Sequence, residues 1–251
     1  GEGLQHQDGH SHILSSTIPN CKSYDPAYGY ELAVIIEHGL KEMYKDKKNY
    51  FYYITVTNER YVQPPKPKGK DVDSNIIKGM HRISKTKKPQ IRLLGSGAIL
   101  NESIRASEML SDFGIESEVW SVSSFNMLRK DGMEVENENV KNASNKSKES
   151  FVTKSFSEHD IPTVASTDYM RAYSEQIRPY INSPYYTLGT DGFGRSDSRA
   201  KLREFFEVDA RSIVMTAAYA LYKEDQLNKK ELQKIYKEIK VNKNKISPWN
   251  T

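Results

Sequence analysis

The first quarter of the chain carries one helical pattern and one strand pattern. Asp25 followed by Pro26 is typical of a helix start, because Asp can cap free N–H groups and Pro lacks the N–H that the first position leaves unpaired. The apolar positions that follow predict a helix to about Tyr44. Residues 49–57 (NYFYYITVT) form an unbroken aromatic and β-branched run, which predicts a strand buried on both faces.

A hydrophilic, proline-rich stretch separates this part from the remainder of the chain. Residues 63–69 (QPPKPKG) cannot form an interior helix or a central strand, because proline has no N–H to donate and a fixed φ angle. We therefore predict a boundary there, between residues 1–66 and residues 67–251.

The second part alternates between strand patterns and helical patterns. This alternation predicts an α/β fold with a mainly parallel sheet covered by helices on both faces. The last helix has the clearest signal, since Asn228 and Glu231 have the spacing of a capping box and an apolar stripe follows them. The predicted strands lie at 91–94, 119–122, 163–165 and 186–188, and the predicted helices at 101–114, 168–180, from 198 onward and 228–239.

Residues 134–154 show neither pattern. They are rich in Asn, Lys, Ser and Glu, and Phe151 is their one aromatic residue. We predict a flexible surface loop, of a length that is unusual in a compact domain.

Length and composition are those of a globular protein. At roughly 150 residues per domain, 251 residues make one large domain or two small ones. The single cysteine, Cys21, excludes an internal disulfide framework and a thiolate zinc site, and it is more typical of a packed apolar side chain than of a nucleophile. No apolar run reaches the roughly 18 residues of a membrane span, and no signal-peptide pattern is present, so we expect a cytoplasmic protein.

The positive charge does not favour a nucleic-acid-binding function. Lys and Arg number 37 and Asp and Glu 33, a net charge of +4. The excess is divided among residues 66–70, 141–154 and 229–245, whereas a nucleic-acid binder normally gathers it in one stripe with aromatic residues. Only the Lys content supports a nucleic-acid-binding function, so we expect neither a nucleic-acid nor a membrane partner.

The opening segment, GEGLQHQDGHSH, concentrates the groups most suited to chemistry. It contains His6, His10 and His12 with Asp8 between them, and it is rich in glycine. Imidazoles exchange protons near neutral pH, and glycines suit a loop that lines a pocket. Three interpretations remain open: a metal site built from these side chains, a polar surface loop with incidental histidines, and an active-site loop that orients or protonates an anionic substrate.

Several blocks of the sequence resemble one enzyme family. The Asp-Gly-x-x-His pattern from Asp8 to His12 is similar to a loop of the transketolase-like thiamine diphosphate enzymes, and the whole opening resembles the homodimeric type of pyruvate dehydrogenase E1 component more closely. Between residues 125 and 162 the chain departs from the family pattern. Further matching blocks are TIPNC at 17–21, SYDP at 23–26, YYIT at 52–55, NERY at 58–61, LLGSG at 93–97, VASTDYM at 164–170, LGTDGFGRSDSR at 188–199 and FEVDA at 206–210.

The resemblance implies an α/β architecture made of the end of a pyrimidine-binding, transketolase-like domain and a transketolase C-terminal-type domain. It also implies a homodimer that decarboxylates pyruvate on thiamine diphosphate with Mg²⁺ and acetylates the lipoyl group of the E2 dihydrolipoyl acetyltransferase, in a complex that includes the E3 dihydrolipoyl dehydrogenase. The diphosphate and metal motifs of the family are absent from this sequence, so we expect the main cofactor site to lie upstream of this segment.

The same resemblance assigns roles within the opening loop. His6 matches an active-site histidine, where an imidazole can hold a carboxylate or an oxyanion, or transfer a proton when the acetyl group passes to the lipoyl group. His12, His10, Glu2 and Asp8 are the expected substrate-binding residues, although a purely structural role for His10 is equally compatible with the sequence.

Two glycine-containing turns have weaker functional signals. The turn at 188–199 exposes Thr190, Asp191, Arg195 and Asp197 at the end of a strand, and we interpret it as a structural turn or as a contact with a second subunit or with E2. The turn from Gly95 to Gly97 lacks the third glycine of a dinucleotide-binding fingerprint, so we interpret it as a plain strand–helix turn. His38 and His81 have no partner pattern, and we expect surface or packing roles for them.

The function that the sequence favours is therefore that of a segment of a pyruvate dehydrogenase E1 component, inactive by itself. The alternative is a non-catalytic C-terminal module for dimerisation or E2 docking.

Overall fold

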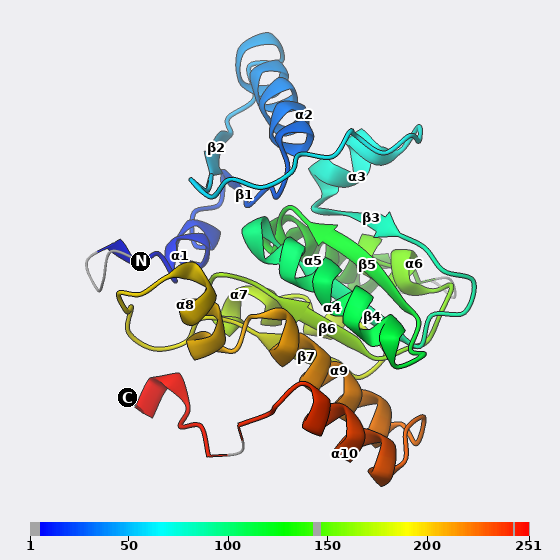
Figure 1. Ribbon diagram of the computed structural model, residues 1–251. Coiled ribbons are helices and arrows are strands. Elements are labelled where there is room, and N and C mark those ends of the chain that lie inside the picture. The colour runs from blue at the N-terminus through cyan, green and yellow to red at the C-terminus, as the bar shows by residue number, and fades with distance from the viewer. Residues whose placement is uncertain (1–5, 143–146, 243, 251) are drawn as a thin grey trace.

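A five-stranded, mainly parallel sheet forms the centre of the computed structural model, which describes residues 6–142, 147–242 and 244–250 (Figure 1). The strand order is β3-β5-β4-β6-β7, and only β3 runs antiparallel to its neighbour. The predicted α/β class is confirmed. The strands are β3 (Met80–Ser84), β4 (Ile91–Gly95), β5 (Ser117–Val122), β6 (Thr163–Ser166) and β7 (Tyr185–Leu188).

Helices cover both faces of this sheet, as the strand–helix alternation predicts. Alternating strand residues point to opposite faces, so Leu93 contacts one helical layer and Leu94 the other. One layer consists of α4 (Leu100–Asp112), α9 (Ala210–Lys223) and α10 (Lys229–Glu238), and the other of α5 (Phe125–Asn142), α6 (Phe151–Phe156) and α7 (Arg171–Glu175).

Two predicted helix starts are confirmed by their capping contacts. Asn228 accepts hydrogen bonds from the backbone N–H groups of Lys230 and Glu231, and the Glu231 carboxylate accepts one from Asn228 N at 2.7 Å. Ser198 caps α8 (Arg199–Phe206). Short polar side chains therefore determine where both helices begin.

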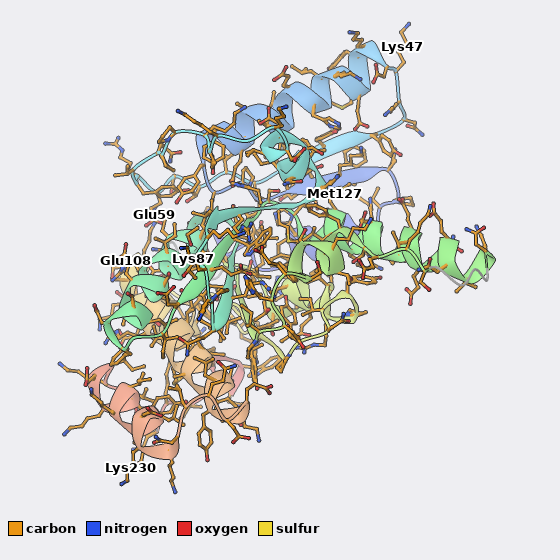
Figure 2. All side chains as sticks on the ribbon, turned by 90° about the vertical axis from the view of Figure 1, so that its right-hand side faces the viewer. Lys47, Glu59, Lys87, Glu108, Met127 and Lys230 are labelled. Atoms are coloured by element: carbon orange, nitrogen blue, oxygen red, sulfur yellow. The ribbon has the colours of Figure 1, made fainter. Side chains whose placement is uncertain are left out.

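The N-terminal part forms a separate small layer at one end of the sheet, with Lys47 at its tip (Figure 2). Its strands β1 (Cys21–Tyr24) and β2 (Phe51–Ile54) pair in parallel. Met127 of α5 contacts a cluster formed around Tyr24, which links this layer to the sheet domain. The remaining elements are α1 (Ser11–Ser16), α2 (Gly29–Leu40), a π-helical turn (Lys41–Lys45) and α3 (Val72–Lys78).

Two expectations for this layer are wrong. The helix begins at Gly29 rather than Pro26, and the carboxylate of Glu31, not that of Asp25, accepts the backbone N–H groups of Ala27 and Tyr28, at 2.6 and 3.0 Å. The strand at 51–54 is not buried on both faces, because β1 is its only neighbour among the residues that the structure describes, and Phe51 is 42% exposed.

The expected loop at 134–154 is largely helical, which corrects that prediction. Helix α5 continues to Asn142, and α6 occupies 151–156. The first half of α5 is anchored by buried Phe125 and Leu128, and helix propagation from an anchored turn needs only residues of adequate helix propensity. The missing apolar periodicity reflects exposure of the second half, not absence of a helix.

The segment between the two parts has no regular structure from residue 55 to residue 69, in agreement with its proline content. The proposed boundary at 66–67 stays a prediction.

The expected helix at 168–180 is replaced by the short α7 and a 3-10 turn, η4 (Arg178–Tyr180). Two further 3-10 turns are η3 (Gly97–Ile99) and η5 (Pro248–Asn250).

Candidate active site

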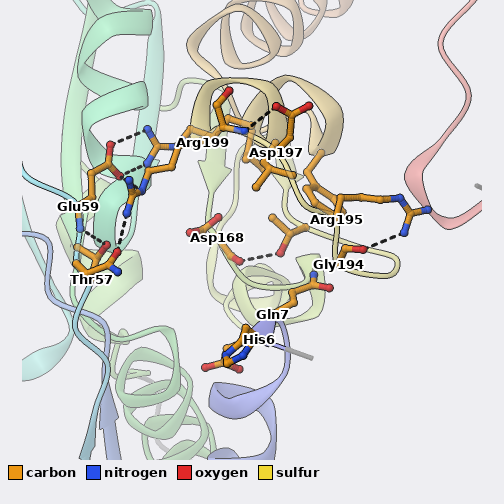
Figure 3. Close-up of a pocket in the computed structure, with 17 residues that line it drawn as sticks. His6, Gln7, Thr57, Glu59, Asp168, Gly194, Arg195, Asp197 and Arg199 are labelled. Atoms are coloured by element: carbon orange, nitrogen blue, oxygen red, sulfur yellow. Dashed lines mark hydrogen bonds and ion pairs between the residues drawn. The ribbon is translucent and has the colours of Figure 1, made fainter. Parts of the chain in front are cut away.

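A pocket of about 630 Å³ lies where the N-terminal loop meets the carboxyl ends of β6 and β7 (Figure 3). The opening loop and the 188–199 turn, which are far apart in the sequence, both line it. This position agrees with open α/β sheets in general, where ligands bind beyond the carboxyl ends of the strands. The lining residues are His6, Gln7, Asp8, Thr57, Asn58, Glu59, Asp168, Thr190, Gly194, Arg195, Asp197, Ser198, Arg199, Leu202, Arg203, Phe206 and Val208.

Short hydrogen bonds hold the pocket's two loops on the ends of β6 and β7. The Thr190 hydroxyl donates to the carbonyl oxygen of Asp168 at 2.7 Å, and Thr190 N donates to Tyr169 O at 2.9 Å. The backbone N–H of Met170 donates to the carbonyl of Gly9 at 3.0 Å. The opening loop and the 188–199 turn are thus connected through one short segment that follows β6.

One wall of the pocket is an ion-pair network. The Arg203 guanidinium binds the Glu59 carboxylate and also lies 3.3 Å from Oε1 of Glu102. Arg199 lies 3.9 Å from Glu59 and donates to Asn58 Oδ1 at 2.6 Å. Both guanidinium groups are therefore already paired with protein groups.

Asp168 has a different environment from these residues. Its side chain reaches the pocket, and its carboxylate makes no hydrogen bond or ion pair with any residue that the structure describes. The residue is exposed to the pocket, and of the charged side chains around it Arg203 favours its ionised form whereas Glu59 disfavours it. Asp168 was not singled out from the sequence, and its position directly after a predicted strand was the one available signal.

The structure brings only some of the predicted loop residues to the pocket. His6 and Asp8 line it. Asp8 also accepts hydrogen bonds from Ser11 N at 3.0 Å and from Ser11 Oγ at 2.5 Å, which fixes the start of α1. His10 is exposed and lies outside the lining, and Glu2 lies outside the described residues.

His12 is buried away from the pocket lining. Its ring stacks on Tyr173 at 4.7 Å between centroids and meets Tyr169 edge-on at 4.6 Å. Nε2 lies 2.9 Å from the Thr55 hydroxyl. Burial lowers the pKa of His12 to about 4, with Asp8 opposing the shift, so the imidazole is neutral at pH 7. This geometry gives His12 a packing role, and a substrate contact for it stays a prediction.

Asp25 is a buried carboxyl that the sequence analysis assigned to a helix cap. Its Oδ1 accepts a hydrogen bond from Thr55 at 2.8 Å, so His12, Thr55 and Asp25 form one buried chain of contacts. Oδ2 of Asp25 has no hydrogen-bond partner among the described residues. Burial raises the pKa of Asp25 to about 7, with the hydrogen bond from Thr55 and the nearby Ser96 opposing the shift. A buried acid in this state is held mainly in its neutral form below pH 7.

Asp25 also explains the turn from Gly95 to Gly97. The sheet's strand order changes direction between β4 and β6, the usual ligand crevice of such folds. Gly97 N donates to the carbonyl oxygen of Asp25 at 3.2 Å, and a Cβ at Gly97 would lie 2.6 Å from Asp25 Oδ2. The N-terminal part thus fills the crevice, which agrees with a plain strand–helix turn.

The four candidate residues of the 188–199 turn do not all lie in the same place. Thr190, Arg195 and Asp197 line the pocket, and Asp197 Oδ1 accepts a hydrogen bond from Ser198 N at 2.6 Å. Arg195 donates to the carbonyl of Gly194 at 3.0 Å and points away from Asp168 (Figure 3). Asp191 instead accepts the backbone N–H of Arg171, beside β7. Their predicted contacts with another subunit stay predictions.

His38, His81 and Cys21 contact other protein side chains or are buried, away from the pocket. His81 Nε2 lies 2.6 Å from Oε1 of buried Glu31, which also accepts the Ser121 hydroxyl at 2.6 Å. His38 Nδ1 lies 2.8 Å from the Tyr52 hydroxyl. Cys21 is buried and its thiol is free, and burial raises its pKa, which disfavours the thiolate.

The metal-site interpretation of the opening loop finds no geometric support. Within residues 6–142, 147–242 and 244–250, no three His, Cys, Asp or Glu side chains are grouped as metal ligands would be. Across the same residues, no helix combines the length and the apolar character needed to cross a membrane.

Comparison with known families gives two matches along the chain. A family model for the pyruvate dehydrogenase E1 component middle domain matches residues 1–64, and one for the transketolase-like C-terminal domain matches residues 79–209. Similar curated proteins are the pyruvate dehydrogenase E1 components of Pseudomonas aeruginosa (54% identity, 88% of this chain, 25% of that protein), Cupriavidus necator (45%, 100% and 28%) and Escherichia coli K12 (45%, 99% and 28%). The chain thus spans about a quarter of their length.

Solved structures show the same fold at low sequence identity. The transketolase of Leishmania mexicana has a TM-score of 0.66 at 15% identity, covering 89% of this chain and 28% of that one. A split-gene transketolase, described as an inactive β4 tetramer, has a TM-score of 0.59 at 14% identity, covering 88% of this chain and 64% of that one. These likenesses agree with the expected transketolase-type architecture.

Proposed function

Because the chain belongs to the transketolase-like C-terminal domain family and its first residues match a pyruvate dehydrogenase E1 middle domain, we propose that it is a segment of a pyruvate dehydrogenase E1 component. The proposed activity of the whole enzyme is thiamine diphosphate-dependent oxidative decarboxylation of pyruvate, with transfer of the acetyl group to the lipoyl group of E2. The observation that carries the proposal is the joining of His6 and the 188–199 turn in one pocket, in a chain 42–54% identical to E1 components along nearly all of its length.

His6 is the proposed substrate-facing residue. Its imidazole lines the pocket, where it can donate a hydrogen bond to an oxyanion or a carboxylate, or move a proton during acetyl transfer. Asp8 supports this role by accepting hydrogen bonds from Ser11 N and Ser11 Oγ, which tie the loop to the start of α1 at the pocket edge. Tyr173, stacked on His12, and Tyr169, edge-on to it, hold the other end of the same segment.

We assign neither the diphosphate nor the metal ion to the described residues. They contain no grouped metal ligands, and the glycine turn that might receive a phosphate is occupied by Asp25. Thiamine diphosphate supplies the carbanion chemistry when it is bound, and we assign its diphosphate and its divalent cation to the remainder of the E1 polypeptide. Homodimerisation and assembly with E2 and E3 belong to the same proposal.

The test is pyruvate-dependent reduction of ferricyanide with thiamine diphosphate and Mg²⁺. The chain is assayed by itself and after mixing with the remaining E1 sequence supplied as a second polypeptide. We expect no activity from the chain alone and activity on mixing. No activity in either assay, although the two polypeptides associate, would instead support a non-catalytic module.

A pair of histidine variants tests the role of His6 within the mixed enzyme. His6→Ala should lower kcat by orders of magnitude, whereas His10→Ala, in the same loop but outside the pocket, should keep near-normal kcat. Circular dichroism and unfolding midpoints should be the same for both variants. Full activity of the His6→Ala enzyme would remove this residue from the mechanism.

A further inference from the structure

One wall of the pocket, formed by residues 57–60, is an irregular segment whose position depends on another part of the chain. Within the described residues, the backbone of this wall makes no hydrogen bond to any other segment. Two arginines of α8 hold it instead, and Figure 3 shows Arg199 extended toward Glu59. Arg199 donates to Oδ1 of Asn58 at 2.6 Å, and Arg203 donates to Oε1 of Glu59 at 3.2 Å and also to Oε2.

The two arginines differ in how far they are withdrawn from water. They are four residues apart on α8, so both extend from one face of the helix. The side chain of Arg199 is about half exposed, whereas that of Arg203 is 13% exposed. An exposed ion pair holds its partners weakly, but a guanidinium that has lost its water needs its protein partners in place. Arg203 is therefore the main anchor of the 57–60 wall.

Glu102 of α4 fixes Arg203 from the side opposite Glu59. Its Oε1 lies 3.3 Å from Nη1 of Arg203, and its Oε2 accepts the backbone N–H of Ala210, the first residue of α9, at 3.0 Å. One guanidinium thus joins the wall, which belongs to the N-terminal part, to the helices that cover the sheet. A lysine ammonium lacks the planar fork of donors that binds two carboxylates in a fixed geometry.

We propose that Arg203 is a positioning residue of the pocket, which holds the 57–60 wall against α8 in the arrangement that binds substrate. The inference rests on the proposed function, which makes this pocket, with His6 in its lining, the substrate site. Buried ion pairs often add no stability over apolar side chains of similar volume, so the role of this one is to fix a single arrangement of the walls.

Release of the wall has a defined kinetic consequence. Only a fraction of the molecules then has the binding-competent pocket, and the apparent affinity falls by that fraction. Saturating substrate restores the competent arrangement. KM therefore rises while kcat stays unchanged, which differs from the loss of kcat expected when a residue that acts on the substrate is removed.

The first test measures KM and kcat for pyruvate in the mixed enzyme with ferricyanide. Arg203→Lys keeps the charge and loses the fork, so KM should rise about fivefold or more while kcat stays within about twofold. Arg105→Lys is the matched control and should change neither constant, because Arg105 contacts the same Glu102 at 3.2 Å but is 65% exposed and lies outside the pocket lining. An unchanged KM in a folded Arg203→Lys enzyme would overturn the proposal.

A second variant tests the same contact from the wall itself. Glu59→Gln removes the charge that binds Arg203, so KM should rise here as well. The double variant Glu59→Gln, Arg203→Lys should have a KM no higher than that of the weaker-binding single variant, because both changes remove one shared contact. Effects that multiply in the double variant would contradict a single clamp between these two residues.

NMR relaxation of this chain alone separates failure of the clamp from failure of the proposed function. The 57–60 amides should have order parameters near about 0.85 in the unmodified chain and below about 0.6 in Arg203→Lys and Glu59→Gln. Arg105→Lys should match the unmodified chain. A wall that stays ordered in both folded variants would overturn the proposal, whether or not the mixed enzyme is active. A released wall with an inactive unmodified enzyme would reject the decarboxylase function and still support Arg203 as the anchor of the wall.

Discussion

The carboxylate of Asp25 lies so close to Gly97 that a Cβ there would be 2.6 Å from Oδ2 and 2.7 Å from Oδ1. The two residues belong to different parts of the chain, and their contact is the point where the N-terminal layer enters the crevice of the sheet domain. A hydrogen bond from Gly97 N to the carbonyl oxygen of Asp25 accompanies it. The interface between the two parts therefore depends on the absence of a side chain at residue 97.

Substitution of Gly97 by alanine should destabilise the protein more than substitution of Gly114. Both glycines have positive φ angles, +49° and +74°, so both variants incur backbone strain of about 1 kcal/mol. Only Gly97 would also meet the Asp25 carboxylate, since nothing lies within 4 Å of a Cβ at Gly114. We expect an additional loss of about 1–3 kcal/mol for Gly97→Ala, measured by urea unfolding. Equal losses would show that the contact between Asp25 and residue 97 accommodates a methyl group at no cost.

The stability of the protein should depend on the ionisation of Asp25. Its pKa is raised to about 7 in the folded protein from an ordinary value of 3.8, so between these limits the folded state holds a proton that the unfolded state has released. Its contribution to stability is therefore full below pH 3.8 and is lost as pH rises to 7, with a slope of at most about 1.4 kcal/mol per pH unit.

Asp25→Asn removes this dependence, because an amide does not titrate. Urea unfolding from pH 4.5 to pH 8 should show that the wild type loses more stability with rising pH than the Asp25→Asn variant does. The variant should retain the contact with Thr55, since an amide oxygen also accepts a hydrogen bond. Parallel pH curves for the two chains would mean that Asp25 is ionised throughout.

His12 should remain uncharged to unusually low pH. Burial lowers its pKa to about 4, so its neutral form contributes stability that is complete above pH 6.5 and is lost as pH falls through the folded pKa. The imidazole signals of His12 in NMR spectra should stay constant from pH 8 down to about pH 5 and should titrate near pH 6.5 once urea unfolds the chain. A His12 signal that titrates near pH 6.5 in the folded protein would contradict the buried position.

Two arginines protect the free edge of β7, and their removal should promote self-association. Arg178 Nη1 donates to Tyr185 O at 2.8 Å, and Arg171 Nε donates to Thr187 O at 3.0 Å. These carbonyls point away from β6, so without the guanidinium groups an unpaired strand edge becomes available to another chain. The double variant Arg171→Ala, Arg178→Ala should form larger species in light scattering than Arg211→Ala, an exposed arginine on α9. Equal scattering from the two variants would mean that other contacts protect this edge.

Local signals account for the correct parts of the fold prediction. The strands at 91–95 and 163–166 are short runs, with Leu93, Leu94, Val164 and Ala165 at their centres, that are buried on both faces. The start of α10 is set by the contact between Asn228 and Glu231, three residues apart. Such features depend on neighbours in the sequence, so a pattern reveals them. Strand β3 was not predicted, because it pairs at the sheet edge with a strand that follows much later in the chain.

The errors have an equally physical origin. Asp25 and Pro26 have the appearance of a helix start, but the tertiary structure uses the Asp25 carboxyl at the contact with Thr55 and Gly97, and the cap passes to Glu31. The second half of α5 is exposed, so it shows no apolar periodicity even though its residues are helical. In both cases the deciding partner lies outside the local window that a pattern examines.

The sequence by itself determined the family, the α/β class and the chemical interest of the His6 loop, because long matching blocks and local periodicity are properties of the chain order. Tertiary structure decided which of those residues act together. It placed His6 and Asp8 beside Thr190 and Asp168, and it buried His12 among aromatic rings. Pocket membership depends on which strand ends are adjacent in space, and that adjacency arises only when the parallel sheet assembles from distant segments.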